Sequence, residues 1–157
     1  MRGAAYTSAM HAKRFSTGAV SKASGISTQM LVIYARAGVI RAVAIRGHGN
    51  GYLWSAEDAA VFLAIRCVWS GTARWNGWRE DYAPTEWLQR LARVARAALR
   101  RGGEVLIVSG RRVRALGFDL LAAEIPILPT CVLLVDLRWV ETETRARLGA
   151  PRPAVAG

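Results

Sequence analysis

Apolar side chains recur at helical spacing in two short stretches near the N-terminus, residues 18–24 and 28–37. Each stretch has residues suited to start and end a helix: Ser16 or Thr17 and Gly25 for the first, Ser27 and Gly38 for the second. Ser and Thr side chains accept hydrogen bonds from the first free amides of a helix, and glycine adopts the left-handed backbone that ends one. The pattern therefore predicts two short helices joined by a tight turn.

The pattern changes after the second glycine. Residues 39–46 and 52–54 are rich in β-prone side chains, and the glycine-rich "GHGNG" (residues 47–51) joins them, which predicts a hairpin. The next four residues, "SAED" from Ser55 to Asp58, have the Ser-x-x-acid spacing of a capping box. A third helix is therefore expected through residues 59–69.

A stretch rich in Gly, Trp and turn formers, residues 70–87, separates this region from a long amphipathic helix that Thr85 can cap and Gly102 can end. One side of that helix is apolar, with Leu88, Leu91, Ala95, Ala98 and Leu99. The other side carries Arg90, Arg93, Arg96 and Arg100. We place the boundary between two halves of the chain in residues 70–87.

The remaining pattern predicts a small sheet with helices. Residues 104–116 indicate a hairpin that turns near residues 109–111, and residues 118–126 a short helix. The continuous apolar run of residues 130–137 is typical of a strand buried on both faces, with Asp136 as a strand-end cap. A helix over residues 138–148 follows. The fold class is thus α+β, with a flexible arm (1–14), two units (15–78 and 79–148) and a disordered tail (149–157).

Composition narrows the class of partner. Of 157 residues, 52% are hydrophobic, enough for a core, and 22 basic residues face 11 acidic ones, a net charge of +11. Such an excess favours nucleic acid, because neutralising phosphates releases counterions. Residues 1–78 hold nine basic and two acidic side chains, and residues 79–157 hold thirteen and nine, so net charge falls from +7 to +4. The first half is the more basic.

The two cysteines, Cys67 and Cys131, lie far apart in apolar surroundings, as reduced core residues do. The sequence has neither a signal peptide pattern nor an apolar run long enough to span a bilayer. His11 and His48 are not spaced with Cys or acidic residues as metal ligands or catalytic dyads. We expect a bacterial or phage-encoded cytoplasmic protein that is not an enzyme and needs no cofactor, metal or membrane.

The order helix, turn, helix, hairpin, helix in residues 15–70 resembles the winged helix-turn-helix of MerR-type regulators, a superfamily that includes phage excisionases. The matching segments are "FSTGAVSKASGIS", "LVIYARAGVI" and "GYLWSAEDAAVFLAI". The resemblance implies double-stranded DNA as partner. Two positions depart from the family pattern: Val32 follows the leucine where an arginine is usual, and Tyr52 or Leu53 stands where the wing has an arginine.

The second helix of a helix-turn-helix presents its N-terminal residues to base edges in the major groove. Gln29 could pair with adenine, and Val32 could contact a thymine methyl group. Nearby cationic and polar residues could bind phosphate or enter the minor groove. The expected DNA-binding residues are Lys22, Ser27, Thr28, Gln29, Val32, Tyr34, Arg36, Arg41, Arg46, His48, Asn50 and Tyr52.

The second half is assigned to dimerisation or partner binding. Its candidate interface residues are Trp78, Trp87, Leu88, Leu91, Arg90 and Arg93. Tryptophan is typical of interface anchors and also of cores. The arginine side of the long helix suits a solvated face, DNA phosphate or an acidic partner.

Together these features predict a sequence-specific DNA-binding regulator that acts as a homodimer on a palindromic site. Two alternatives within this class are an antitoxin-type autorepressor, whose second half binds a toxin, and an excisionase-like architectural factor. An alternative of another class is a protein-interaction module whose winged fold does not read DNA sequence.

Overall fold

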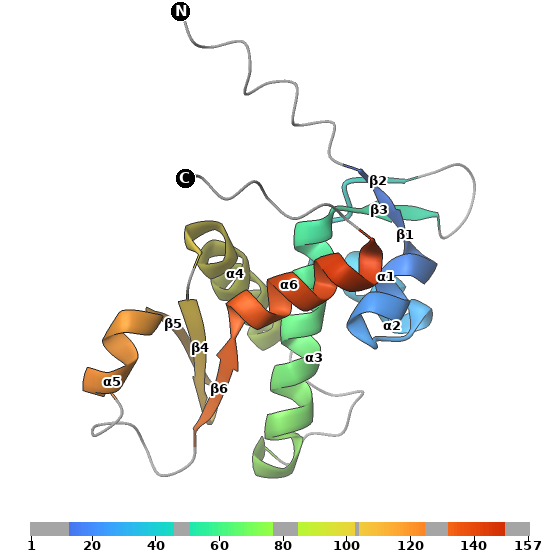
Figure 1. Ribbon diagram of the computed structural model, residues 1–157. Helices are drawn as coiled ribbons and strands as arrows, with labels where there is room; N and C mark the ends of the chain where they lie inside the picture. The colour runs from blue at the N-terminus through green and yellow to red at the C-terminus, as the bar shows by residue number, and fades with distance from the viewer. Residues whose placement is uncertain (1–12, 46–50, 77–84, 103, 125–131, 150–157) are drawn as a thin grey trace, which may run out of the picture.

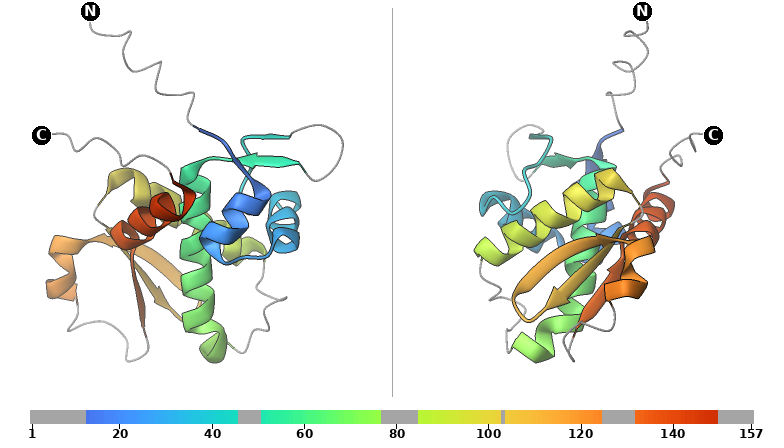
Figure 2. Two further views of the ribbon diagram at one scale, coloured as in Figure 1. Left: turned by 45° about the vertical axis from the view of Figure 1, so that its right-hand side comes forward. Right: turned by 90° about the vertical axis from the view of Figure 1, so that its left-hand side faces the viewer.

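The protein is described by a computed structural model that covers residues 13–45, 51–76, 85–102, 104–124 and 132–149. Its fold class is α+β, as predicted. Two three-stranded antiparallel sheets lie on opposite sides of the central helix α3 (Ala56–Asn76), as Figures 1 and 2 show. The other helices pack around α3.

The N-terminal region begins with β1 (Phe15–Ser16), α1 (Thr17–Ser24) and α2 (Thr28–Arg36). Ser16 Oγ accepts a hydrogen bond from Ala19 N at 3.2 Å, and Ser27 Oγ accepts one from Met30 N at 3.3 Å. Of the two capping candidates for α1, Ser16 is therefore the cap. Gly25 (φ 76°) and Gly38 (φ 69°) follow the two helices in the left-handed conformation. Both predicted helices and their terminators are confirmed.

The N-terminal sheet has the order β1-β3-β2, with β2 at Ala44–Ile45 and β3 at Tyr52–Trp54. The hairpin is confirmed, but its first strand is much shorter than the predicted residues 39–46. Val39 and Ile40 are buried in the core instead of pairing with a strand. The tip, residues 46–50, lies outside the described residues. The pairing of Phe15 with Trp54, which creates β1, was not predicted.

Helix α3 begins at the predicted capping box. Asp58 N donates to Ser55 Oγ at 3.0 Å, and Ser55 N donates to Asp58 Oδ2 at 2.9 Å, so each residue satisfies a backbone amide of the other. The helix is longer than predicted, because it continues to Asn76 through residues that the composition assigns to the boundary.

The C-terminal region contains α4 (Thr85–Arg101), β4 (Glu104–Ser109), β5 (Arg112–Gly117), the 3-10 helix η2 (Phe118–Leu120), α5 (Leu121–Glu124), β6 (Leu133–Asp136) and α6 (Leu137–Leu148). Ser109 pairs with Arg112, so the β4–β5 hairpin turns where predicted. The long amphipathic helix, the short helix and the last helix are also confirmed.

One strand prediction is wrong. The C-terminal sheet has the order β5-β4-β6, so β4 is the central strand and β6 lies at an edge. Leu134 on β6 is exposed, whereas residues Val105 to Val108 on β4 are all buried. An apolar run alone does not reveal which strand of a sheet is central.

Asp136 caps α6, as expected, because its Oδ1 accepts a hydrogen bond from Arg138 N at 2.9 Å. Partial burial raises the pKa of Asp136, but hydrogen bonds from the Arg138 side chain and backbone outweigh it, so the net pKa lies below its usual value.

The buried side chains of both halves form one hydrophobic core. Phe62 on α3 contacts Trp54 in an edge-to-face arrangement, with ring centroids 5.1 Å apart. The same core includes Leu91 on α4, Leu106 on β4 and Val140 on α6. Helix α3 packs against α1, α4, α6 and β6, and α6 crosses beside it (Figure 2). The C-terminal half therefore helps to hold the N-terminal helices in place.

Within the described part of the chain, every helix is too short or too polar to cross a bilayer.

Candidate nucleic-acid interface

Helix α2 has one buried and one open face. Leu31 is fully buried in the core, and Tyr34 packs beside it with its ring stacked on Phe62 at a centroid distance of 6.3 Å. The open face carries Thr28, Gln29, Ile33 and Arg36, all exposed. These four positions fall within about 140° of the helix circumference at 3.6 residues per turn. A partner approaching from solvent would therefore meet all four together.

The open face borders a hollow of about 470 Å³ between α2 and the first turn of α1. Its lining residues are Thr17, Thr28, Gln29, Val32, Ile33 and Arg36. Thr17 also fixes the position of this surface, because its hydroxyl donates to the Tyr52 carbonyl at 3.3 Å and accepts from Trp54 Nε1 at 3.2 Å. These bonds hold the start of α1 against β3.

Two of the residues expected to contact DNA need correction. Val32 is only 8% exposed, so it contributes to the floor of the hollow and offers little surface to a thymine methyl group. Ile33, which was not predicted, is 45% exposed and takes that place. Helical spacing could have found it, because Ile33 follows Gln29 by four residues and shares its face. Tyr34 belongs to the core side of α2 and cannot reach the same surface.

The other expected DNA contacts have varied surroundings. Ser27 is exposed, but its hydroxyl is engaged as the α2 cap. Lys22 is exposed in the last turn of α1, and Arg41 is exposed just beyond α2. Tyr52 is half-buried, with its ring 5.8 Å from that of Trp54. The predicted wing-tip residues Arg46, His48 and Asn50 lie outside the described residues.

The predicted dimer or partner interface is only partly available. Trp87, Leu88 and Leu91 are buried in the core of the protein, so they cannot form an interface with a partner. Trp87 Nε1 in addition donates to the Arg111 carbonyl at 3.1 Å. Arg90 and Arg93 are exposed, as an interface would need. Trp78 lies outside the described residues.

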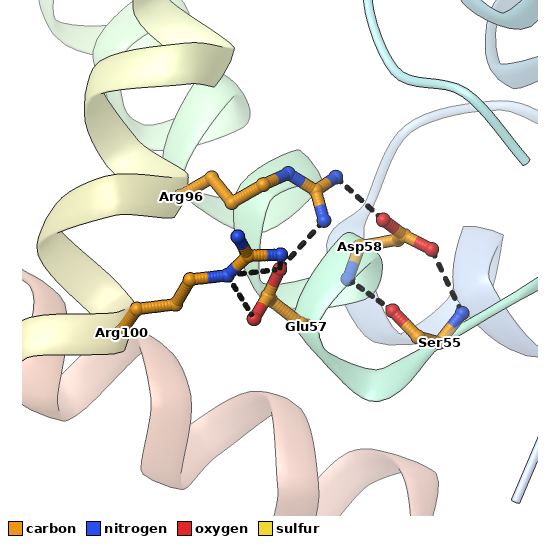
Figure 3. A network of polar contacts seen from close by, with 5 residues as sticks. All are labelled: Ser55, Glu57, Asp58, Arg96 and Arg100. Atoms are coloured by element: carbon orange, nitrogen blue, oxygen red, sulfur yellow. Dashed lines mark hydrogen bonds and ion pairs between the residues drawn. The ribbon is translucent and has the colours of Figure 1, made fainter. Parts of the chain in front are cut away.

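Two of the four arginines on one side of α4, Arg96 and Arg100, bind acidic residues of α3, as Figure 3 shows. Arg96 Nη1 donates to Glu57 Oε1 at 2.6 Å, and Arg96 Nη2 to Asp58 Oδ1 at 2.5 Å. Arg100 binds the same Glu57 through its Nε and Nη2 atoms. These contacts join α4 to the first turn of α3. The side of α4 that carries the arginines is therefore not a uniformly solvated face.

Glu57 responds to these neighbours. Its partial burial raises its pKa, but hydrogen bonds from Arg100 and Arg96 and the two positive charges outweigh this effect, so the net pKa lies below the usual value. Glu57 is therefore held in its charged form, which strengthens the tie between α3 and α4.

Two observations concern side chains that could bind a metal ion or act as a nucleophile. No three His, Cys, Asp or Glu side chains among them are grouped as ligands of a metal ion. Cys67 is half-buried, and burial raises the pKa of its thiol despite the nearby Arg147 and Arg66, which disfavours the reactive thiolate. Cys131 lies outside the described residues.

Comparison with protein-family models gives no match, and comparison with curated proteins finds no similar sequence.

Proposed function

We propose that the protein binds double-stranded DNA in a sequence-specific manner through the open face of α2. In this proposal α1, the turn at Gly25–Ser27 and α2 act as a helix-turn-helix, and the β2–β3 hairpin acts as its wing. This is the arrangement that the resemblance to MerR-type regulators implies.

The observation that carries the proposal is the chemistry of that face. Thr28 and Gln29, in the first turn of α2, supply hydroxyl and amide groups that can bond to base edges. Ile33 supplies an exposed apolar surface that suits a thymine methyl group. Arg36 adds a positive charge in the last turn. A face with all of these groups meets the requirements of base readout better than those of a merely solvated helix.

Charge supports the same partner. The net charge of +11 favours a polyanion. Glu57 and Asp58, the two acidic residues of the N-terminal half, are both paired with arginines of α4. The surface around α2 therefore keeps its positive charge.

We further propose that the DNA-binding unit acts as a homodimer that regulates transcription. Trp87, Leu88 and Leu91 are buried, so other side chains of the C-terminal half would have to contact a second copy or another protein. The exposed large apolar side chains of this half support such a contact; these side chains are Phe118, Leu120, Leu134 and Trp139. An antitoxin-type repressor and an excisionase-like factor are consistent with the same surfaces.

Selection of bound duplexes from a random-sequence pool tests the proposal. The chain should enrich a defined motif, and its log affinity should fall with log salt at a slope of roughly −0.9 per neutralised phosphate. Gln29→Ala should weaken binding to the selected duplex by about 1–3 kcal/mol and relax the preference at one base pair. Thr142→Ala, a change at an exposed position of α6, is the control.

Two results would contradict the proposal. One is a failure to bind any duplex at low salt. The other is a Gln29→Ala protein that remains folded and keeps both affinity and preference. The latter would favour the protein-interaction module, whose winged fold does not read sequence.

A further inference from the structure

We propose that a groove between the end of α2 and helix α4 binds the phosphate backbone of the same duplex that α2 reads. The inference rests on the proposed function and extends it. It assigns a direct DNA contact to the arginine side of α4, for which the sequence leaves a solvated face, DNA phosphate or an acidic partner open.

The groove is a hollow of about 550 Å³. One wall is the segment that follows α2, and the other is the middle of α4. Its lining residues are Gly38, Val39, Ile40 and Arg41 from the first wall and Gln89, Ala92, Arg93 and Arg96 from the second. It thus brings together basic residues that are about fifty positions apart in the sequence, Arg41 and Arg93.

The two walls are joined by polar contacts. Gln89 Nε2 donates to the Ala37 carbonyl at 3.0 Å, which fastens α4 to the end of α2. The left-handed backbone of Gly38 permits the turn at this point, and a Cβ atom there would lie 3.6 Å from Gln89 Nε2. Arg96, on the far side of the groove, is fixed by Glu57 and Asp58 (Figure 3). The groove is therefore preformed, which lowers the entropic cost of binding.

The groove carries positive charge that no acidic side chain in its lining neutralises. Arg41 and Arg93 are both exposed, and neither forms an ion pair with another described residue. Arg90 lies one turn before Arg93 on α4 but does not line the groove. Glu57 and Asp58, the acidic residues bound by Arg96, are already neutralised. Of the three arginines that line the groove, Arg41 and Arg93 are therefore the two available to an anion.

The place of the groove, next to the end of α2, favours DNA phosphate as that anion. The groove starts at Gly38, two residues after Arg36, the last residue of α2. A duplex that lies along the open face of α2 continues past the end of the helix, where its backbone would meet Arg41 and then Arg93. The planar guanidinium group binds phosphate oxygens through two parallel hydrogen bonds.

Salt-dependent binding measurements on the whole chain test the inference. The variants are Arg41→Gln, Arg93→Gln and the double variant, and the control is Arg112→Gln. Arg112 is also exposed and forms no ion pair with another described residue. It lies on the face of the C-terminal sheet turned away from α4, because its neighbour Val113 packs into the core. Each variant is assayed on the selected duplex and on an unrelated duplex.

Each groove variant should make the salt slope shallower by about one unit, and the double variant by about two. The wild-type advantage over each single variant should then shrink roughly 3.5-fold when salt rises fourfold. Both duplexes should be affected equally, because phosphate contacts carry no sequence information. Arg112→Gln should behave as wild type. Melting curves verify that every variant is folded.

The outcomes separate this inference from the proposed function. If wild type binds and Gln29→Ala relaxes its preference, but Arg41→Gln and Arg93→Gln behave like Arg112→Gln, the groove does not bind DNA and α2 alone does. If the wild-type chain binds no duplex even at low salt, the proposed function and the groove fall together. A loss confined to the selected duplex would show base readout by these arginines, which also overturns the inference.

Discussion

Helices α2 and α4 are both amphipathic and rich in polar side chains on one face, yet the protein uses the two polar faces differently. The face of α2 is open and borders a hollow, with exposed Ile33 among its polar neighbours. The face of α4 is partly closed, because two of its four arginines bind acidic residues of α3. An open face can meet a partner, whereas a closed one holds the protein together.

The same difference exists between two pairs of arginines on α4. Arg96 and Arg100 serve the fold, and Arg90 and Arg93 remain exposed. Both pairs consist of arginines, and both lie on the same side of the helix. What distinguishes them is the position of Glu57 and Asp58 on another helix, so the role of an arginine is decided by its tertiary neighbours.

The largest expected effect contrasts the buried, apolar side of α4 with the open face of α2. Leu91→Ala should lower the free energy of unfolding by about 2–5 kcal/mol, because it removes a fully buried side chain and leaves a cavity. Ile33→Ala, on the open face of α2, should change it by no more than about 0.5 kcal/mol. Urea denaturation measures both. Equal losses for the two variants would contradict the distinction between the buried side of α4 and the open face of α2.

A smaller difference in the free energy of unfolding is expected between variants of two arginines of α4, Arg96 and Arg93. Arg96→Met keeps the aliphatic stem but leaves the Asp58 carboxylate, whose side chain is 2% exposed, without its cationic partner. The free energy of unfolding should fall by about 1–3 kcal/mol. The matched Arg93→Met should cost at most about 0.5 kcal/mol. A tolerant Arg96→Met protein would mean that the tie between α3 and α4 contributes nothing to stability.

In DNA binding, unlike in stability, we expect a change on the open face of α2 to have the larger effect. Ile33→Ala should weaken binding to the selected duplex by about 1 kcal/mol and reduce a preference for thymine, because it removes apolar contact area. Thr142→Ala, at an exposed position of α6, is the control. Competition binding assays on both variants give the comparison. The prediction is wrong if both variants bind as wild type.

The smallest expected effect concerns pH. The pKa of Glu57 is lowered in the folded protein, so the unfolded chain takes up its proton first as pH falls. The stabilisation is present above the ordinary pKa of 4.5 and is lost as pH falls through the folded value. Glu57→Gln should therefore flatten the acid side of the stability profile. Glu86→Gln, at an exposed residue of α4, should leave that profile steep.

Local features of the fold could be read from the sequence. The caps Ser16 and Ser27, the capping box at Ser55 and the turn near Gly110 depend on residues a few positions apart. Pairings between distant segments could not. The strand β1 exists only because Phe15 meets Trp54, and the order of the C-terminal sheet places β4, not β6, at its centre.

In the candidate site, too, local features could be predicted from the sequence, whereas contacts between distant segments could not. Thr28, Gln29 and Arg36 are where helical spacing predicts them. Val32 and Tyr34 were misplaced, because their burial depends on what α3 and α1 present to α2. The meeting of Arg41 with Arg93 depends on how α4 packs against the end of α2, which no local pattern encodes.

A hydrogen bond between the two ends of the fold bears on how the chain is made. Arg147 Nη1, near the end of α6, donates to the Ala23 carbonyl of α1 at 3.0 Å, across 124 residues. On the ribosome α1 and α2 emerge first, whereas the helices that complete their core, α4 and α6, emerge much later. The N-terminal helices therefore reach their final packing only after α6 has left the exit tunnel, so an interrupted translation product lacks part of the core that holds them.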